Sequence, residues 1–281
     1  MLSITRLKLC ENVLPFCYSL CILRFVMKLG FIGTGNITVA VVNGICTSRI
    51  SFSKIIVSSR NKSKAENLKK KFKKVSIAKT NQEIVDKCDW VFLAVTPKVG
   101  EKILPKLNYR SSQTIVNLIS TIGNSQLKKY VKVKAKIVRA LPLPPIALRK
   151  GPVPICPASK KVKNFFNHLG TAVEISNEKL FTNFWCMTAM MAPYYEILNT
   201  LSKWLSSKGL KKVDTQKYIT SLFSAMSEDA VVNSNKDLKI LIKNSQTPGG
   251  LNEQALNKLR KLGFYKLLNK TANNVLKILE K

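Results

Sequence analysis

The chain has 281 residues, 46% of them apolar, and 47 Lys+Arg against 15 Asp+Glu give it a formal net charge of +32. This length suggests one or two domains, and the apolar content suffices for a hydrophobic core, which excludes a mostly disordered chain. The charge raises nucleic acid as a partner. Only 8 of the 47 cations are Arg, however, and the lysines are spread along the whole chain instead of forming a stripe. We therefore expect no nucleic-acid function.

The cysteines and the single histidine restrict the chemistry further. There are 7 Cys, an odd number, and no C-x-x-C. This pattern argues against a disulfide scaffold or a Cys/His zinc site, so we expect no metal, reduced thiols and a cytoplasmic location. His168 lies in a predicted surface helix. A triad mechanism would depend on this one residue, and we assign it no catalytic role.

Residues 1–26 contain an apolar stretch around Val13–Leu23 that Pro15 interrupts. The stretch is short for a bilayer span, and no small-residue cleavage site follows it. A compact strand and a glycine turn begin directly at Met27. We interpret residues 1–26 as an over-extended start and Met27 as the true first residue, with a targeting segment as the alternative. No membrane association is expected.

The first predicted strand, Met27–Ile32, leads into Gly33, Thr34, Gly35, Asn36 and Ile37, and an apolar helix follows. Strand, glycine turn and helix form the setting of the G-x-G-x-x-[G/A] fingerprint. Gly33 permits the tight turn, and Gly35 lets the backbone approach a pyrophosphate at the helix N-terminus. Thr38 stands at the third position in place of Gly or Ala. We predict dinucleotide binding here.

The second strand, Ile55–Ser58, is followed by Ser59, Arg60 and Lys62. An NAD-specific site usually has Asp or Glu at the end of this strand to hold the ribose 2′-hydroxyl. Hydroxyls and a guanidinium suit a 2′-phosphate instead. We predict NADPH as the cofactor, with NADH as the alternative.

The alternation then continues with a charged helix over Lys62–Phe72, a short helix near Gln82–Lys87 and several apolar strands. The predicted strands are Val75–Ala78, Trp90–Val95, Thr114–Ser120, Lys136–Arg139 and Val173–Ile175. This pattern predicts an α/β Rossmann-type domain over residues 27–176, with a parallel sheet and helices on both faces. Ligands bind at the carboxyl ends of such strands. Val95, Thr96, Pro97 and Lys98 are therefore expected beside the glycine turn.

Strand signals disappear after residue 176. Five amphipathic stretches predict an all-α domain over 177–281: Glu178–Met190, Pro193–Ser207, Asp214–Ser234, Asn252–Leu262 and Phe264–Leu279. Their broad apolar faces suggest a helical bundle between subunits.

A loop with Thr247, Gly249, Gly250, Leu251 and Asn252 precedes one of these helices. Its backbone N–H groups at a positive helix end are suited to a carboxylate. The same spacing fits an ordinary turn between two helices.

Several motifs together resemble pyrroline-5-carboxylate reductases from Met27 almost to the end. They are Lys28–Asn36, Leu93–Pro97, Arg139–Pro142, Gly170–Glu178, Pro193-x-Tyr195 and Thr247–Gly250. The resemblance implies a Rossmann domain, an all-helical domain that forms an interlocked homodimer or higher oligomer, and hydride transfer from NAD(P)H to the C=N of a cyclic imine carboxylate. Pyrroline-5-carboxylate reduction to L-proline, in proline biosynthesis, is the leading candidate.

The resemblance implies a substrate site at Met191 and the Thr247–Asn252 loop. The candidate proton donors are Tyr195, which matches the family's position, and Glu253, with Tyr194 or solvent as alternatives. The chain departs from the family at four places, three of which fall where the substrate or nicotinamide is expected. Met190-Met191-Ala192 replaces Gly-Ser-Gly, Leu141-Pro142-Leu143 replaces Met-Pro-Asn, Leu251-Asn252 replaces Thr-Thr, and Thr96 replaces Lys. A related imine or keto-acid reductase with another or bulkier substrate, and a non-catalytic NADPH-binding regulator, remain alternatives.

Overall fold

The computed structural model describes residues 26–280; the predicted over-extended start lies almost wholly outside the described residues. Within this range, eight strands form one sheet in the order β3-β2-β1-β4-β5-β6-β7-β8. The strands are β1 (Met27–Ile32), β2 (Phe52–Val57), β3 (Val75–Ile77), β4 (Trp90–Leu93), β5 (Thr114–Asn117), β6 (Lys136–Ala140), β7 (Pro152–Cys156) and β8 (Thr171–Glu174). The order reverses between β1 and β4, which is where ligands bind in open α/β sheets.

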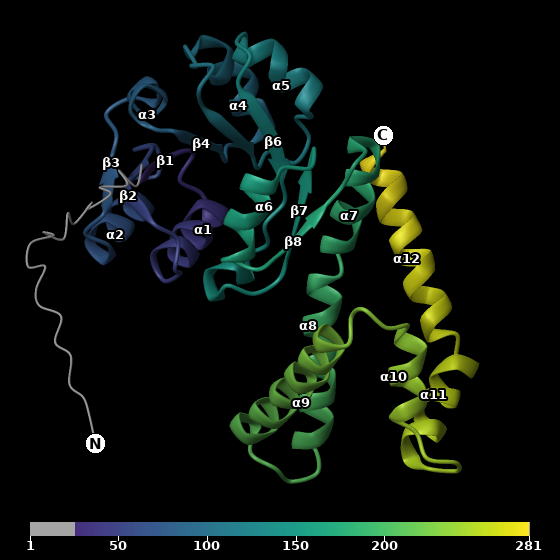
Figure 1. Cartoon of the computed structure of the whole chain (residues 1–281). Helices are drawn as coiled ribbons and strands as arrows, with labels where there is room; N and C mark the ends of the chain where they lie inside the picture. The colour runs from purple at the N-terminus through teal and green to yellow at the C-terminus, as the bar shows by residue number, and fades with distance from the viewer. Residues whose placement is uncertain (1–25, 281) are drawn as a thin grey trace, which may run out of the picture.

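Six helices cover the two faces of this sheet (Figure 1). They are α1 (Asn36–Cys46), α2 (Lys62–Lys71), α3 (Asn81–Lys87), α4 (Pro97–Ile103), α5 (Asn124–Val131) and α6 (Lys160–Asn167). Apolar side chains of α1, α2 and α6 pack with Phe31 and Phe92 on one face, and those of α3, α4 and α5 pack on the other. This arrangement confirms the predicted Rossmann-type architecture.

The predicted parallel sheet is parallel over β1–β6 only, because β7 and β8, which pair in parallel with each other, both run in the opposite direction. β7 runs antiparallel to β6, with Arg139 opposite Cys156 and Ala140 opposite Ile155. Strand β7 was not predicted, because Pro152 and Pro154 lack N–H groups and argue against a strand. Both prolines are tolerated because the ladder to β6 is short and the Pro154 carbonyl accepts from the Leu141 N–H at 3.1 Å. The helices α4 and α5 were not predicted either.

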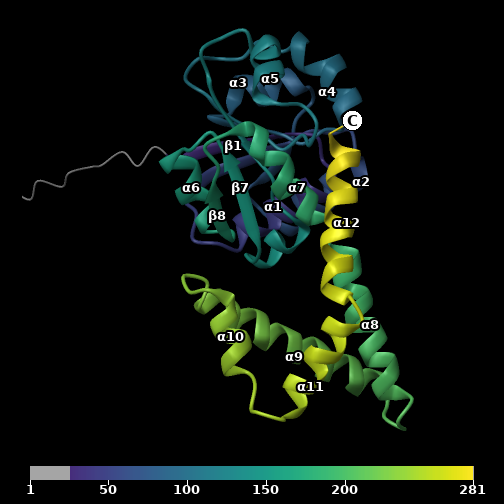
Figure 2. The same ribbon diagram turned by 90° about the vertical axis from the view of Figure 1, so that its right-hand side faces the viewer.

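The chain beyond β8 is entirely helical in the described residues. It comprises α7 (Phe181–Thr188), α8 (Met191–Ser206), α9 (Lys212–Val232), α10 (Leu238–Asn244), α11 (Leu251–Lys261) and α12 (Phe264–Leu279). Figures 1 and 2 show these helices extending away from the sheet, with α12 beside α7 and α9 against α8. Pro193 lies in the first turn of α8, where its missing N–H costs little. Helix α10 was not predicted.

Candidate active site

The turn after β1 requires glycine at its first position. Gly33 has a φ of +101°, and a Cβ there would lie 2.4 Å from the Ala94 carbonyl oxygen. A Cβ at Gly35 would meet no atom within 4 Å, so a side chain there would point into open space beside the turn. The two glycines therefore have different roles: Gly33 shapes the turn against β4, and Gly35 keeps space free in front of α1.

Side-chain hydroxyls hold this turn from both sides. Thr38, at the third fingerprint position, is fully buried and donates to the Gly33 carbonyl at 2.6 Å. The Ser58 hydroxyl accepts from the Gly33 N–H at 2.9 Å, and the Thr34 hydroxyl donates to the Ser58 carbonyl at 2.6 Å. Thr38 thus replaces the small residue of the fingerprint without opening the helix–strand packing. The structural role of Ser58 was not predicted.

A pocket of about 420 Å³ opens in front of the turn. Its lining is Gly33, Thr34, Gly35, Arg60, Asn61, Lys62, Ala94, Val95 and Thr96. No carboxylate lines it, whereas Arg60 and Lys62 do, so the pocket is suited to an anion. Helix α1 begins at Asn36 without a side-chain cap or an acidic residue in its first turn. Its free N–H groups and its dipole add to the attraction for phosphate.

The structure thus brings Gly33, Thr34, Gly35, Arg60, Val95 and Thr96 together in one pocket, with Asn36 and Ile37 opening the adjoining helix. The remaining predicted cofactor residues, Ser59, Pro97 and Lys98, do not line it. Two polar neighbours escaped the sequence analysis. Asn61 caps α2, and Lys64 donates to the Asn36 side chain at 2.6 Å. Asn is a preferred residue at the N-cap of a helix, so Asn61 directly before the predicted helix was a signal from which the cap could have been predicted.

The Thr247–Asn252 loop lies at the other end of the molecule, between α10 and α11, and its pocket shares no residue with the nucleotide pocket. The prediction that the backbone N–H groups of this loop are open to a carboxylate needs correction at Gly249 and Gly250. The Gly249 N–H donates to the Glu253 carboxylate at 2.6 Å, and the Gly250 N–H donates to the Thr247 carbonyl at 2.8 Å. The Asn252 amide donates to the Ser245 carbonyl, and Leu251 is 84% exposed. The turn and the helix that follows it therefore already engage the N–H groups of Gly249 and Gly250.

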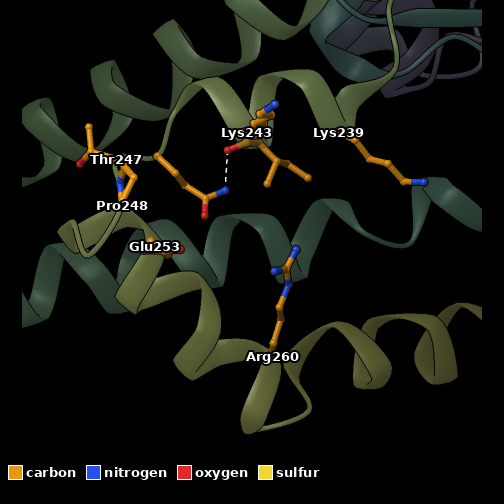
Figure 3. A pocket seen from close by; sticks show the side chains of 8 residues that line it. Lys239, Lys243, Thr247, Pro248, Glu253 and Arg260 are labelled. Carbon is orange, nitrogen blue, oxygen red and sulfur yellow. Dashed lines mark hydrogen bonds between the residues drawn. The ribbon is translucent and has the colours of Figure 1, made fainter.

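Figure 3 shows the pocket of about 400 Å³ beside this loop. Lys239 and Lys243 from α10 and Arg260 from α11 line it, together with Thr247, Pro248 and Glu253. Glu253 is the only carboxylate in the lining, and the Gly249 N–H holds it. The pocket therefore has more positive than negative side chains, and the carboxylate of Glu253 already binds the Gly249 N–H at its edge.

The other two predicted residues lie apart from both pockets. Tyr195, on α8, is 56% exposed, and its ring lies 5.7 Å from that of Tyr194. Met191 lines a third, apolar cavity between β7 and α7. A single chain therefore does not gather Tyr195, Glu253 and the glycine turn into one site. In residues 26–280 no group of three His, Cys, Asp or Glu side chains is placed to hold a metal, and no helix has the length and apolarity of a membrane span.

Comparison with known proteins places these features in context. A family model described as NADP oxidoreductase, coenzyme F420-dependent, matches residues 28–122. Pyrroline-5-carboxylate reductase 2 of Bacillus subtilis is 24% identical over 247 residues, which cover 84% of this chain and 88% of the relative.

Two solved structures share the fold. The pyrroline-5-carboxylate reductase of Coxiella burnetii has a TM-score of 0.79 at 20% identity and covers 91% of this chain and 98% of its own. The pyrroline carboxylate reductase of Plasmodium falciparum, with NADP bound, has a TM-score of 0.75 at 22% identity and covers 90% of this chain and 97% of its own. The chain is thus similar in sequence to a pyrroline-5-carboxylate reductase over most of its length, and it shares the fold of two solved members of that group.

Proposed function

We propose that this protein is an NADPH-dependent reductase that transfers hydride to the C=N bond of a small cyclic imine carboxylate, with pyrroline-5-carboxylate to L-proline as the leading candidate. The observation that carries the proposal is the pocket in front of Gly33 and Gly35, which has two cations and no carboxylate in its lining. The similarity to pyrroline-5-carboxylate reductases over 84% of the chain supports the reaction class.

The residues of this pocket fit NADPH. Gly35 leaves room for the pyrophosphate, and the N-terminus of α1 stabilises its charge. Arg60 and Lys62 follow β2, where a 2′-phosphate would lie, and Arg60 suits phosphate because its guanidinium donates two parallel hydrogen bonds. When bound, NADPH supplies the hydride. The protein orients the two reactants and excludes water, and positioning accounts for most of the catalysis of such a step.

The substrate carboxylate is assigned to the Thr247–Asn252 loop. Lys239, Lys243 and Arg260 attract an anion to this loop, and a substrate carboxylate would displace Glu253 from the Gly249 N–H. The exposed Tyr195 is the proposed proton donor to the imine nitrogen, and the displaced Glu253 is the alternative donor.

The loop and the glycine turn meet only if a second copy contributes one of them, so the proposal includes a homodimer or a higher oligomer. Exposed apolar side chains on every helix from α8 to α12 support this assembly, among them Trp204, Tyr218, Leu238, Leu259 and Leu267. None of the residues of α10, α11 or α12 is buried in the single chain.

The test is oxidation of NADPH by the full chain in the presence of pyrroline-5-carboxylate, followed at 340 nm, together with a direct measurement of NADPH binding. We expect turnover, and we expect Arg60→Ala to weaken NADPH binding by about tenfold or more with little effect on NADH, because one charge-assisted phosphate contact contributes about 1.5–3 kcal/mol. NADPH binding without turnover of any imine or keto acid contradicts the proposal and favours a regulatory protein.

A further inference from the structure

A cavity of about 200 Å³ lies between β7 and the helices α7 and α8. The chain after β6 forms one wall, since Leu141 and Leu143 run beside the start of β7 and the Leu141 N–H donates to the Pro154 carbonyl. The lining used in this argument is Leu141, Leu143, Pro154, Val173, Phe184 and Met191.

The cavity opens at the same edge of the sheet as the glycine turn. Strands β1, β4, β5 and β6 are parallel, and their carboxyl ends meet at that edge. Because β7 is antiparallel to β6, the amino end of β7 reaches the same edge and brings Pro154 there. The antiparallel strand β7 therefore places this cavity at the edge of the sheet that also carries the glycine turn.

The lining of this cavity is apolar, although the chain as a whole is rich in lysine. No charged side chain contributes to it, and Thr188 is its one polar residue. A charged or strongly polar group would lose its hydration here without a partner. Phe184 and Met187 remain 40% and 51% exposed, so apolar surface on the helix side is available for a ligand to cover. Methionine side chains adapt their shape to such ligands.

We propose that this cavity receives an apolar substituent on the ring of the cyclic imine carboxylate, so that the preferred substrate is larger than pyrroline-5-carboxylate itself. The inference rests on the proposed function and specifies its substrate class. The reaction balances as before: NADPH gives a hydride to the imine carbon and the nitrogen takes one proton, while the substituent only binds. Leu143 and Met191 are then specificity-determining residues.

The test compares the full chain on pyrroline-5-carboxylate and on the same ring carrying a methyl, an isopropyl or a phenyl group. One added methylene in a matching apolar pocket raises kcat/KM by about tenfold or more. We expect kcat/KM to rise from the unsubstituted ring to the isopropyl or phenyl compound by at least about tenfold.

Two variants connect this preference to the cavity. Leu143→Phe fills it and should lower the ratio of kcat/KM for the substituted over the unsubstituted ring by about tenfold, whereas Met191→Ala enlarges it and should shift the preference toward the phenyl compound. Leu148→Phe is the matched control, since Leu148 is 73% exposed and outside the cavity. It should leave the ratio unchanged. Circular dichroism and the elution volume show whether each variant folds and assembles.

The outcomes separate the two proposals. Failure to reduce any of these imines overturns the proposed function. Reduction of pyrroline-5-carboxylate with equal or higher kcat/KM than the substituted rings overturns only the present inference. A change in the oligomeric state with Leu143→Phe at an unchanged ratio also overturns it, because the cavity would then hold a side chain from a second copy.

Discussion

The Ser58 hydroxyl accepts a hydrogen bond from the Gly33 N–H in the nucleotide turn, whereas the adjacent Ser59 is exposed to solvent. Replacing Ser58 with Ala leaves the buried Gly33 N–H without its acceptor. We expect Ser58→Ala to lower the free energy of unfolding by about 1–3 kcal/mol and to weaken NADPH binding. Ser59→Ala should change stability by less than about 0.5 kcal/mol. Urea denaturation and a binding titration measure both effects, and equal stability losses in the two variants would contradict the assignment.

Glu253 competes with the substrate for the Gly249 N–H if the proposed carboxylate site is correct. Glu253→Gln keeps the size of the side chain and removes its negative charge, so it binds the loop less strongly and repels an anion less. We expect KM for an imine carboxylate to fall severalfold, about 1 kcal/mol of improved binding, with a smaller change in kcat. Glu101→Gln, an equal change of charge on α4, is the control. An unchanged KM or a large loss of kcat would argue against competition, and the latter would favour Glu253 as proton donor.

The sequence predicted the residues of the nucleotide turn better than those of the loop. Glycine spacing between a strand and a helix reports a backbone requirement, and the φ of Gly33 meets it. The hydrogen bond between the Gly249 N–H and Glu253 could not be predicted, because the spacing of residues does not show which N–H group a flexible carboxylate side chain binds. The roles of Ser58 and Thr38 could not be predicted from the sequence either. Their hydroxyls form hydrogen bonds with backbone atoms of Gly33 that lie close to them only in the folded chain.

Glu178 joins three elements where the sheet meets the helices. Its Oε1 accepts from the Asn124 N–H at the start of α5 at 2.7 Å and lies 3.3 Å from Arg139 Nη1 on β6. The guanidinium of Arg139 lies 4.5 Å from the centre of the Phe181 ring on α7. Burial lowers the pKa of Arg139, and the charge and hydrogen bond of Glu178 oppose that shift.

Removal of this carboxylate should loosen the junction. Glu178→Ala leaves the Arg139 guanidinium buried without its counter-charge, and we expect a loss of about 1–3 kcal/mol, below the value for a fully buried pair because Glu178 is partly exposed. Glu228→Ala breaks the exposed pair with Lys150 and should cost less than about 1 kcal/mol. Chemical denaturation compares the two. Equal losses would show that the Glu178 contacts do not fix the junction.

Element prediction succeeded where one signal dominated and failed where two signals opposed each other. The strands β1, β2 and β4 are short apolar runs between turns, and all three are confirmed, although β2 begins at Phe52 and not at the predicted Ile55. Strand β7 has apolar residues alternating with two prolines, and the prolines outweighed the pattern. Helix α10 has only seven residues, Leu238–Asn244, too few for a periodicity to stand out.

Large apolar side chains are exposed along the helical region of the single chain, among them Trp204, Tyr218 and Leu267, and contiguous exposed apolar surface usually marks an interaction site. We expect sedimentation to give a mass of at least twice 31.5 kDa. Trp204→Glu and Tyr218→Glu, both at side chains that are 61% exposed, should shift the mass toward that of one chain. Leu148→Glu on the Rossmann-type half should leave it unchanged. A single-chain mass for the unmodified protein at micromolar concentration would contradict the assembly.

The distance between the glycine turn and the Thr247–Asn252 loop has a genetic consequence. If each catalytic centre combines the turn of one copy with the loop of another, a variant defective at Gly33 and a variant defective at Gly250 should each be inactive alone. Expressed together in one cell, the two would form mixed assemblies in which some centres receive an intact turn and an intact loop. Partial recovery of activity from two inactive alleles would then be the expected phenotype, and its absence would indicate that both parts come from one chain.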